Sequence, residues 1–251
     1  MAYDNNRFCW HGVISTDPEK AAAFYTSVLG WGVLKQPMGD TEGTMFTAGG
    51  VPRAHVMAPP MEGVPSHWDN YLRVDDVDAR TQACVAAGGA VMVPPTDIPV
   101  GRFSVVTSPS GAAISLFHES DEAGATHAPD GDGSICWTEL HSKDVDADLA
   151  WLKTALGFET QEMPMPEGPY HLLVQGESQR GGVMVSQHDQ APSMWLSWVQ
   201  VANVDETLEL ATANGGNVLA PAFEVPVVGR LGIIADSTGG VFGVMTPPAQ
   251  G

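Results

Sequence analysis

The sequence repeats itself, because its second half resembles its first half at a nearly constant offset. The pair Cys9-Trp10 recurs as Cys136-Trp137, 127 residues later, and the offset becomes 128 after a proline-containing turn. A repeat of this length predicts two copies of one structural unit. Further pairs at the first offset are Asp17 and Asp144, Gly30 and Gly157, Trp68 and Trp195, and Val77 and Val204.

The stretch between the copies has the composition of a linker. Residues 119–134 read ESDEAGATHAPDGDGS, a polar run rich in Gly, Asp and Ser without hydrophobic periodicity. We therefore predict a first domain over residues 1–118, a linker over 119–134 and a second domain over 135–251.

Helix signals occur twice in each copy. Asp17 precedes Pro18 and Gly30 follows the apolar run, which predicts an N-cap, an N1 proline and a C-terminal glycine around a helix over 18–29. Short β-prone runs lie before and after each such segment. Each half therefore predicts strand, helix and two or three strands, twice over. By the same signals the other helices run from Asp76 to Gly88, from Asp144 to Gly157 and from Asn203 to Gly215.

The charge balance restricts the possible partners. The chain carries 30 acidic and 11 basic residues, a formal net charge of −19, and 43% of its residues are hydrophobic. Such a charge repels phosphate backbones and anionic lipid, so we expect no nucleic-acid or membrane partner. Without a basic leader, a long apolar run or any Cys-x-x-Cys, the sequence predicts a cytoplasmic protein. We expect a monomer or homodimer, and the family resemblance described below implies a small-molecule partner.

Three segments carry a resemblance to a known family. They are STDPEKAAAFYTSVLGW from residue 15, RVDDVDA from residue 73 and PPTDIPVGRFSVVTSPSGAAISLF from residue 94, each with a counterpart in the second half. They resemble the vicinal oxygen chelate superfamily of glyoxalase I, bleomycin-resistance proteins and extradiol dioxygenases, and especially its tandem two-domain bacterial members. The resemblance implies an α+β fold of four βαβββ modules, paired into two domains with cupped mixed sheets around cavities.

The same resemblance implies where a divalent metal would bind. Most of the implied positions hold tryptophan, leucine or glycine, whose side chains supply no metal ligand. The usual metal site is therefore not preserved, and we expect no cofactor. Only Asp69 remains as a possible ligand at these positions, and an irregular set with His55 and His67 is a metal-binding alternative. The implied positions hold Trp10, Asp69 and Ser115 in the first half and Trp137, Leu196 and Gly243 in the second.

Glu139 and His141 are the candidate catalytic residues. Side chains alternate along a strand, so both residues share a face with Trp137, which we expect to face the cup. A buried glutamate beside an imidazole can transfer a proton to or from a bound carbonyl compound. Alternatively, Glu139 bonds to the backbone or to an arginine, and His141 lies near a solvated strand end. The first half has Gly12 and Ile14 at these positions, which predicts one working cavity, in the second half.

Other residues are candidates for ligand binding. Trp10, Trp137 and Trp198 predict a flat apolar wall for a ring-shaped ligand, or else plain filling of the cup. Asp69, Tyr71 and Arg73 share a strand face, where Arg73 could orient an anionic ligand or pair with the aspartate.

The sequence leaves three functions open, and with them the question of whether the chain is an enzyme. The first is a metal-independent lyase or isomerase that uses Glu139 and His141. The second is a protein that binds or sequesters an aromatic or drug-like molecule without chemistry. The third is a metal-dependent lyase or dioxygenase with non-standard ligands.

Overall fold

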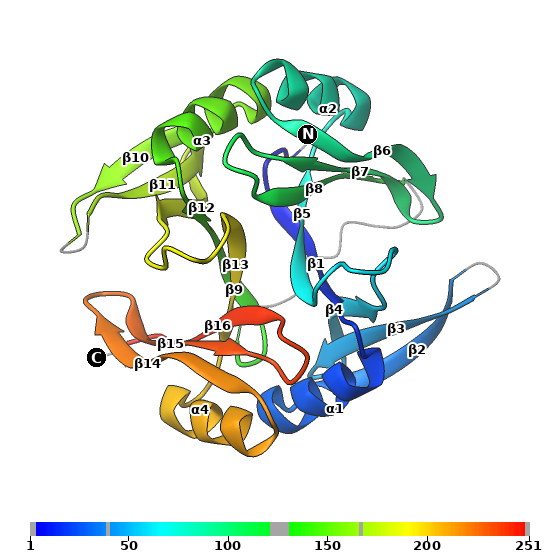
Figure 1. Ribbon diagram of the computed structural model, residues 1–251, viewed down its shortest axis with the longest axis vertical. Coiled ribbons are helices and arrows are strands. Elements are labelled where there is room, and N and C mark those ends of the chain that lie inside the picture. The colour runs from blue at the N-terminus through cyan, green and yellow to red at the C-terminus, as the bar shows by residue number, and fades with distance from the viewer. Residues whose placement is uncertain (1–3, 39–40, 121–130, 166–167, 249–251) are drawn as a thin grey trace. The chain divides into compact units, whose positions relative to one another are not determined.

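The computed structural model describes residues 4–38, 41–120, 131–165 and 168–248. Over these residues the chain forms sixteen strands, four α-helices and one π-helical turn, as four successive βαβββ modules (Figure 1). Module 1 comprises β1 (Phe8–Ile14), α1 (Pro18–Leu29), β2 (Gly32–Met38), β3 (Thr41–Ala48) and β4 (Val51–Met57). Module 2 comprises β5 (His67–Arg73), α2 (Val77–Ala86), β6 (Ala90–Ile98), β7 (Gly101–Thr107) and β8 (Ala113–Glu119).

The second half repeats this order of elements. Module 3 comprises β9 (Ile135–Ser142), α3 (Val145–Trp151), the π-helical turn η1 (Leu152–Leu156), β10 (Glu159–Met163), β11 (Tyr170–Gln175) and β12 (Ser178–Val185). Module 4 comprises β13 (Met194–Gln200), α4 (Val204–Ala213), β14 (Asn217–Val225), β15 (Gly229–Ala235) and β16 (Val241–Thr246).

All four helices begin where the sequence predicts. Each predicted N-cap side chain accepts a hydrogen bond from the backbone N–H three residues later, which satisfies a donor that the first turn leaves unpaired. At the C-terminal end of α1 the Gly30 φ is +65°, the left-handed conformation in which glycine is favoured. The caps are Asp17, Asp76, Asp144 and Asn203.

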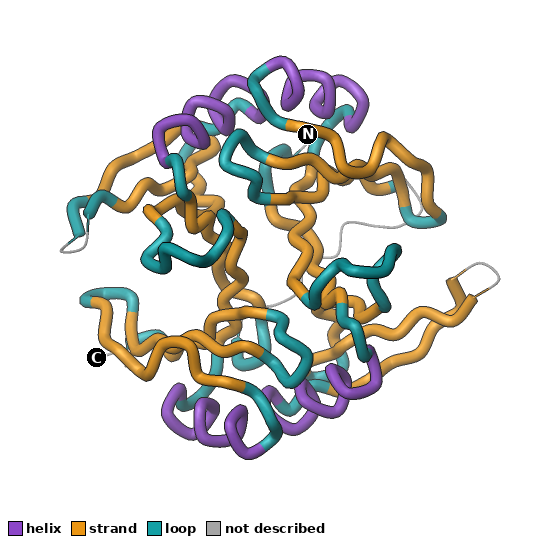
Figure 2. Tube along the Cα trace, viewed as in Figure 1, coloured by secondary structure: helices purple, strands orange, loops and turns teal. Residues whose placement is uncertain are grey.

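Each half of the sequence supplies one mixed sheet of eight strands. The first has the order β2-β3-β4-β1-β5-β8-β7-β6, and the second has β10-β11-β12-β9-β13-β16-β15-β14. In every module the first and last strands pair in parallel, and the last three strands of the module pair antiparallel. The α+β fold of four βαβββ modules is therefore confirmed (Figure 2).

The chain divides into two compact units that each contain parts of both halves. The first unit is Met1–Trp10, Asp69–His127 and Thr138–Trp195, and the second is His11–Trp68, Ala128–Trp137 and Leu196–Gly251. Each first strand of a module runs from one unit into the other. The domain limits 1–118 and 135–251 stay a prediction, and residues 121–130 of the expected linker lie outside the described residues.

Each unit has its own hydrophobic core between helices and sheet. In the first unit Trp151 and Leu140 belong to one buried cluster with residues of α2 and β8. In the second unit α1 and α4 lie side by side over a cluster that includes Trp31 and Phe242. Trp68 and Trp195 are 6% and 3% exposed and belong to these cores. No helix within the described ranges is long and apolar enough to cross a membrane.

Candidate functional site

Glu139 lies in a hydrogen-bonded triad on module 3. Its carboxylate is held at both oxygens, since Nε2 of His141 lies 2.8 Å from Oε1 and the Tyr170 hydroxyl donates to Oε2 at 2.7 Å. Glu139 is only 6% exposed. The structure thus brings the two predicted catalytic residues together and adds Tyr170, which the sequence did not single out.

Three neighbouring strands position the triad. Leu140 is fully buried in the helix-covered core, so the alternation along β9 directs Glu139 and His141 to the opposite face, which we call the wall of the module. Tyr170 comes from β11, and Gly182 on β12 lies beside Glu139 in the parallel register. A Cβ atom on Gly182 would lie 1.9 Å from the Tyr170 hydroxyl. Only glycine therefore lets the tyrosine reach across β12 to the carboxylate.

The triad has the chemistry of an acid/base site. A carboxylate can accept a proton, while the imidazole and the phenol, each within hydrogen-bonding distance of it, can stabilise its charge or pass a proton on. The side chains of Glu139 and His141 are 8% and 14% exposed, so this exchange would occur largely shielded from water.

The four modules place different residues at the position that Glu139 occupies in module 3. In modules 1, 3 and 4 a glycine lies beneath the ring of a larger residue, because a Cβ on it would come within 2.6 Å of His55, Tyr170 or Trp198. The modules keep the same backbone and differ in what covers it. The pairs in register are Gly12 and His55, Tyr71 and Ser115, Glu139 and Gly182, and Trp198 and Gly243.

Asp69 and Tyr71 form a second polar cluster, on module 2. The Ser115 hydroxyl lies 2.9 and 3.0 Å from the two carboxylate oxygens of Asp69. Burial, followed by the charge of Asp69 and a hydrogen bond to it, raises the pKa of Tyr71 well above its ordinary value. Arg73 forms an ion pair with Glu119 at 2.7 Å, an acceptor that the sequence did not suggest.

The three candidate tryptophans have different surroundings. Trp10 on β1 and Trp137 on β9 are partly exposed, as residues that contact a ligand would be. Trp198 is 4% exposed and its ring covers Gly243. Trp198 therefore packs against the backbone of module 4, and its role in ligand binding stays a prediction.

The histidines of the irregular metal set have separate surroundings. His55 on β4 lies over Gly12, and burial lowers its pKa from 6.5 to about 4. His67 begins β5, and its Nδ1 lies 2.8 Å from the Pro65 carbonyl oxygen. In the described part of the chain, no three His, Cys, Asp or Glu side chains are grouped so that they could hold a metal ion. The set His55, His67 and Asp69 is thus not assembled as a metal-binding group.

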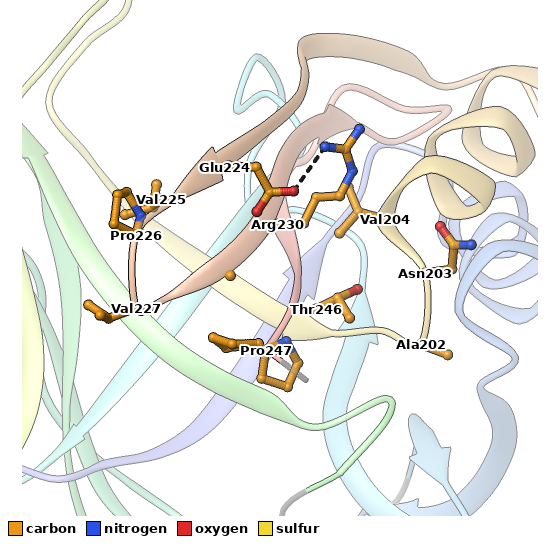
Figure 3. A pocket seen from close by; sticks show the side chains of 12 residues that line it. Ala202, Asn203, Val204, Glu224, Val225, Pro226, Val227, Arg230, Thr246 and Pro247 are labelled. Carbon is orange, nitrogen blue, oxygen red and sulfur yellow. Dashed lines mark hydrogen bonds and ion pairs between the residues drawn. The ribbon is translucent and has the colours of Figure 1, made fainter. Parts of the chain in front are cut away.

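Module 4 contains an open hollow of about 490 Å³ between the start of α4 and the β14–β15 turn (Figure 3). Arg230 on its border binds Asp205 at 2.6 Å and Glu224 at 3.1 Å, so its charge serves to tie the turn to the helix. Val227, at the tip of the turn, is 89% exposed. The hollow lacks the convergent buried polar groups found on module 3.

Comparisons with known proteins agree with this architecture. Residues 8–116 match the family model "Glyoxalase/Bleomycin resistance protein/Dioxygenase superfamily". A Mycobacterium tuberculosis protein named "Putative glyoxylase CFP32" is 35% identical over 248 residues, which cover 96% of this chain and 95% of that protein. The chain belongs to the glyoxalase/bleomycin resistance/dioxygenase superfamily.

Other proteins that are similar to this chain match it over most of its length. "Anthracycline biosynthesis protein DauV" of a Streptomyces species is 28% identical, with 94% of this chain and 91% of that protein covered. A Mn(II)-bound glyoxalase from Novosphingobium aromaticivorans has a TM-score of 0.66 at 18% identity, covering 96% of this chain and 82% of that chain. The 2,3-dioxygenase LapB from Pseudomonas sp. KL28 has a TM-score of 0.64 at 14% identity, with 96% and 92% covered. These two structures support the fold alone.

The metal positions implied by the superfamily do not suit a divalent ion in this chain. Ser115 donates its hydroxyl to Asp69, while Leu196 is 2% exposed and Gly243 lies beneath Trp198. Divalent ions need several converging oxygen, nitrogen or sulfur ligands, and these residues present one carboxylate. The residues present therefore do not fit the metal site of the superfamily.

Tyr170 and Gly182 are the site residues that sequence reasoning missed. Tyr170 lies 31 residues from Glu139 on a strand that is not its neighbour in the sheet, so no spacing rule connects the two. The available signal was Gly182, because a glycine inside a strand often marks a place where another group approaches the backbone closely.

Proposed function

We propose that the wall of module 3 is the proton-transfer site of a metal-independent lyase or isomerase that acts on a small carbonyl compound. The observation that carries the proposal is the buried Glu139 carboxylate with a titratable partner at each oxygen. The name of the Mycobacterium relative supports a glyoxalase-type reaction.

The proposed step conserves protons and electrons. Glu139 removes the proton from the carbon next to the carbonyl group, the electron pair of that C–H bond forms a carbon–carbon double bond, and the carbonyl π pair moves onto the oxygen to give an enolate. His141 and Tyr170 keep the carboxylate oriented and shielded from bulk water during the transfer. In an α-hydroxy carbonyl compound, return of this proton to the former carbonyl carbon, with transfer of the hydroxyl proton to the former carbonyl oxygen, completes an isomerisation. Where the β-carbon carries a leaving group, the enolate re-forms the carbonyl group and the leaving group departs with its bonding pair, which completes an elimination.

Deuterium exchange tests this proposal without knowledge of the natural substrate. The wild-type chain is expected to accelerate exchange of the α-protons of hydroxyacetone, dihydroxyacetone or pentane-2,4-dione in D₂O, followed by ¹H NMR. Glu139→Gln should lower the catalysed rate by roughly 10²-fold or more. Glu159→Gln, at an exposed position on β10 of the same module, is the matched control and should keep it. Uncatalysed rates with all three probes, or full activity of Glu139→Gln, would contradict the proposal.

A binding function for an aromatic compound is the second candidate. It is favoured by the partly exposed Trp10 and Trp137 and by the relatives named anthracycline biosynthesis proteins. Under this alternative, 1,8-dihydroxyanthraquinone quenches the tryptophan fluorescence saturably and is recovered unchanged. Replacement of either tryptophan by phenylalanine should remove part of the quenching, whereas Trp198→Phe should not.

A further inference from the structure

The hollow of module 4 is lined by residues that take no part in the Glu139 triad. Its volume of about 490 Å³ lies within the range of roughly 300–1,000 Å³ that is usual for small-molecule sites. Val225, Pro226 and Val227 line it from the β14–β15 turn, and Pro247 lines it after the end of β16 (Figure 3). The hollow therefore offers an apolar surface of suitable size to a ligand.

The equivalent place on module 2 is charged instead. Three carboxylates of module 2 have two apolar side chains and one amide as their counterparts on module 4. These pairs are Asp75 and Ala202, Asp76 and Asn203, and Glu119 and Pro247, at offsets of 127 and 128 residues. An apolar ligand can therefore approach module 4 without removing three carboxylates from water, which would oppose its binding on module 2.

Val227 is held at the border of the hollow in an unfavourable backbone conformation. Its φ is +62°, in the left-handed region that β-branched residues rarely adopt. Such a conformation costs on the order of 1–3 kcal/mol, and residues strained in this way are frequent at ligand-binding sites. The side chain is 89% exposed, so little packing offsets this cost. An apolar ligand in the hollow would cover this side chain.

The polar border of the hollow carries an excess of negative charge. The Arg230 guanidinium donates to both oxygens of Asp205 and to Oε1 of Glu224, so two carboxylates share one cation. Oε2 of Glu224 accepts no hydrogen bond from a residue in the described part of the chain. The Glu224 side chain is 67% exposed, so the charge acts through water and its effect is modest. It favours a cationic group over an anionic one.

We propose that the hollow binds a small hydrophobic amine, with the apolar body against Val225, Val227 and Pro247 and the ammonium group at Oε2 of Glu224. Removal of apolar surface from water supplies most of the affinity, and the carboxylate determines which charge is accepted. No covalent bond changes in this binding. The site uses none of the residues of the proton-transfer proposal and does not rest on it.

Three compounds with one cyclohexane ring and different charges test the ligand class. They are cyclohexylmethylamine, cyclohexylmethanol and cyclohexanecarboxylate, which are cationic, neutral and anionic at pH 7. Titration of the full-length chain, followed by the methyl NMR signals of Val225 and Val227, should show saturable binding of the amine. The amine should bind about threefold tighter than the alcohol, and the carboxylate should bind most weakly. No saturable shift up to about 20 mM amine, or an amine that binds no tighter than the other two, would overturn the proposal.

Glu224→Gln tests the charge preference. It should make the amine bind no tighter than the alcohol, while the alcohol keeps its affinity. Asp97→Asn makes the corresponding change on module 2, where Arg102 also binds two carboxylates, and should keep the wild-type preference. An undiminished preference in Glu224→Gln, or its loss in Asp97→Asn, would contradict the assignment to this hollow.

Val227→Gly tests the apolar border. Glycine adopts the left-handed conformation without strain, so this variant keeps the turn while it removes the side chain. The amine and the alcohol should both bind about threefold more weakly or worse. Val100→Gly, in the corresponding turn of module 2 where the valine is 44% exposed, is the matched control and should bind both compounds as the wild type does. Wild-type affinities in Val227→Gly would contradict the proposal.

Discussion

Glu139 shows how one substitution between copies of a module changes what the module can do. Its position corresponds to Gly12 in module 1, where the backbone has the same parallel pairing and a histidine ring fills the space. Burying a carboxylate costs several kcal/mol unless its oxygens are hydrogen-bonded, and His141 and Tyr170 supply these bonds. The three residues therefore depend on one another for stability as well as for chemistry.

Gly182→Ala should damage the triad although it adds one methyl group. Its Cβ would overlap the Tyr170 hydroxyl at 1.9 Å, so the tyrosine must leave Glu139 or β12 must shift. We expect a loss of about 1–3 kcal/mol in the free energy of unfolding and a fall in deuterium exchange. Tyr170→Phe removes the hydroxyl without the overlap and should cost less stability. Urea unfolding compares the two variants, and a Gly182→Ala protein as stable as the wild type would refute this geometry.

His55 should make the protein less stable in mild acid. Its folded pKa of about 4 lies below the unfolded value of 6.5, so the unfolded chain binds the proton more readily between these values. The contribution is present in full above pH 6.5 and declines as the pH falls towards 4, by on the order of 3 kcal/mol in total.

Urea unfolding of the wild type and His55→Gln at pH 7 and pH 5 measures this contribution. The variant should lose less stability than the wild type over that interval, whereas His188→Gln, at an exposed position, should behave as the wild type does. Equal losses in wild type and His55→Gln would show that another group causes the acid sensitivity.

At the scale of elements, local rules were sufficient for the helices and insufficient for the site. Asp17 and Asp144 predict where helices start, because an N-cap bond joins residues that are three positions apart in the sequence. Strand alternation likewise placed Glu139 and His141 on one face. Tyr170 could not be found in this way, because its contact depends on the pairing of β11 with β12 and of β12 with β9. The sequence also gave no indication that the last turn of the third helix is π-helical.

Asp144→Ala should shorten or loosen α3. The Asp144 carboxylate accepts the Ala147 N–H at 3.1 Å, and alanine leaves that donor without its cap. The expected cost is about 1 kcal/mol in the free energy of unfolding. Asp144→Ser, which keeps a capping oxygen, should restore most of the stability. Identical urea midpoints for the alanine and serine variants would contradict the capping role.

At the scale of the whole molecule, the repeated modules keep the same backbone architecture but differ in the side chains of their walls. Four modules share one order of elements, whereas the middle of each wall has a different pair of residues. The repeat was readable from the sequence because caps and turn glycines obey local rules. The sequence did not show which segments form each compact unit, since this depends on which helices pack together in three dimensions.

Salt should stabilise the protein, because 30 acidic residues against 11 basic residues leave a net charge of −19, and the excess acidic groups repel one another in the folded state. Raising NaCl from about 10 to 300 mM shortens the screening length from roughly 30 Å to under 8 Å, and the Tm should rise by a few degrees. KCl at equal ionic strength should have the same effect. A Tm that falls with salt would mean that attractive ion pairs outweigh the net repulsion.

Deuterium exchange by chelator-treated protein tests the central claim most directly, because it examines Glu139 and metal independence together. After dialysis against EDTA, with elemental analysis confirming the absence of bound metal, the wild type should exchange the α-protons of the best probe at its original rate. Glu139→Gln should lose the exchange both with and without added Mn²⁺. Loss of exchange in the wild type on chelation, restored by Mn²⁺, would contradict the account.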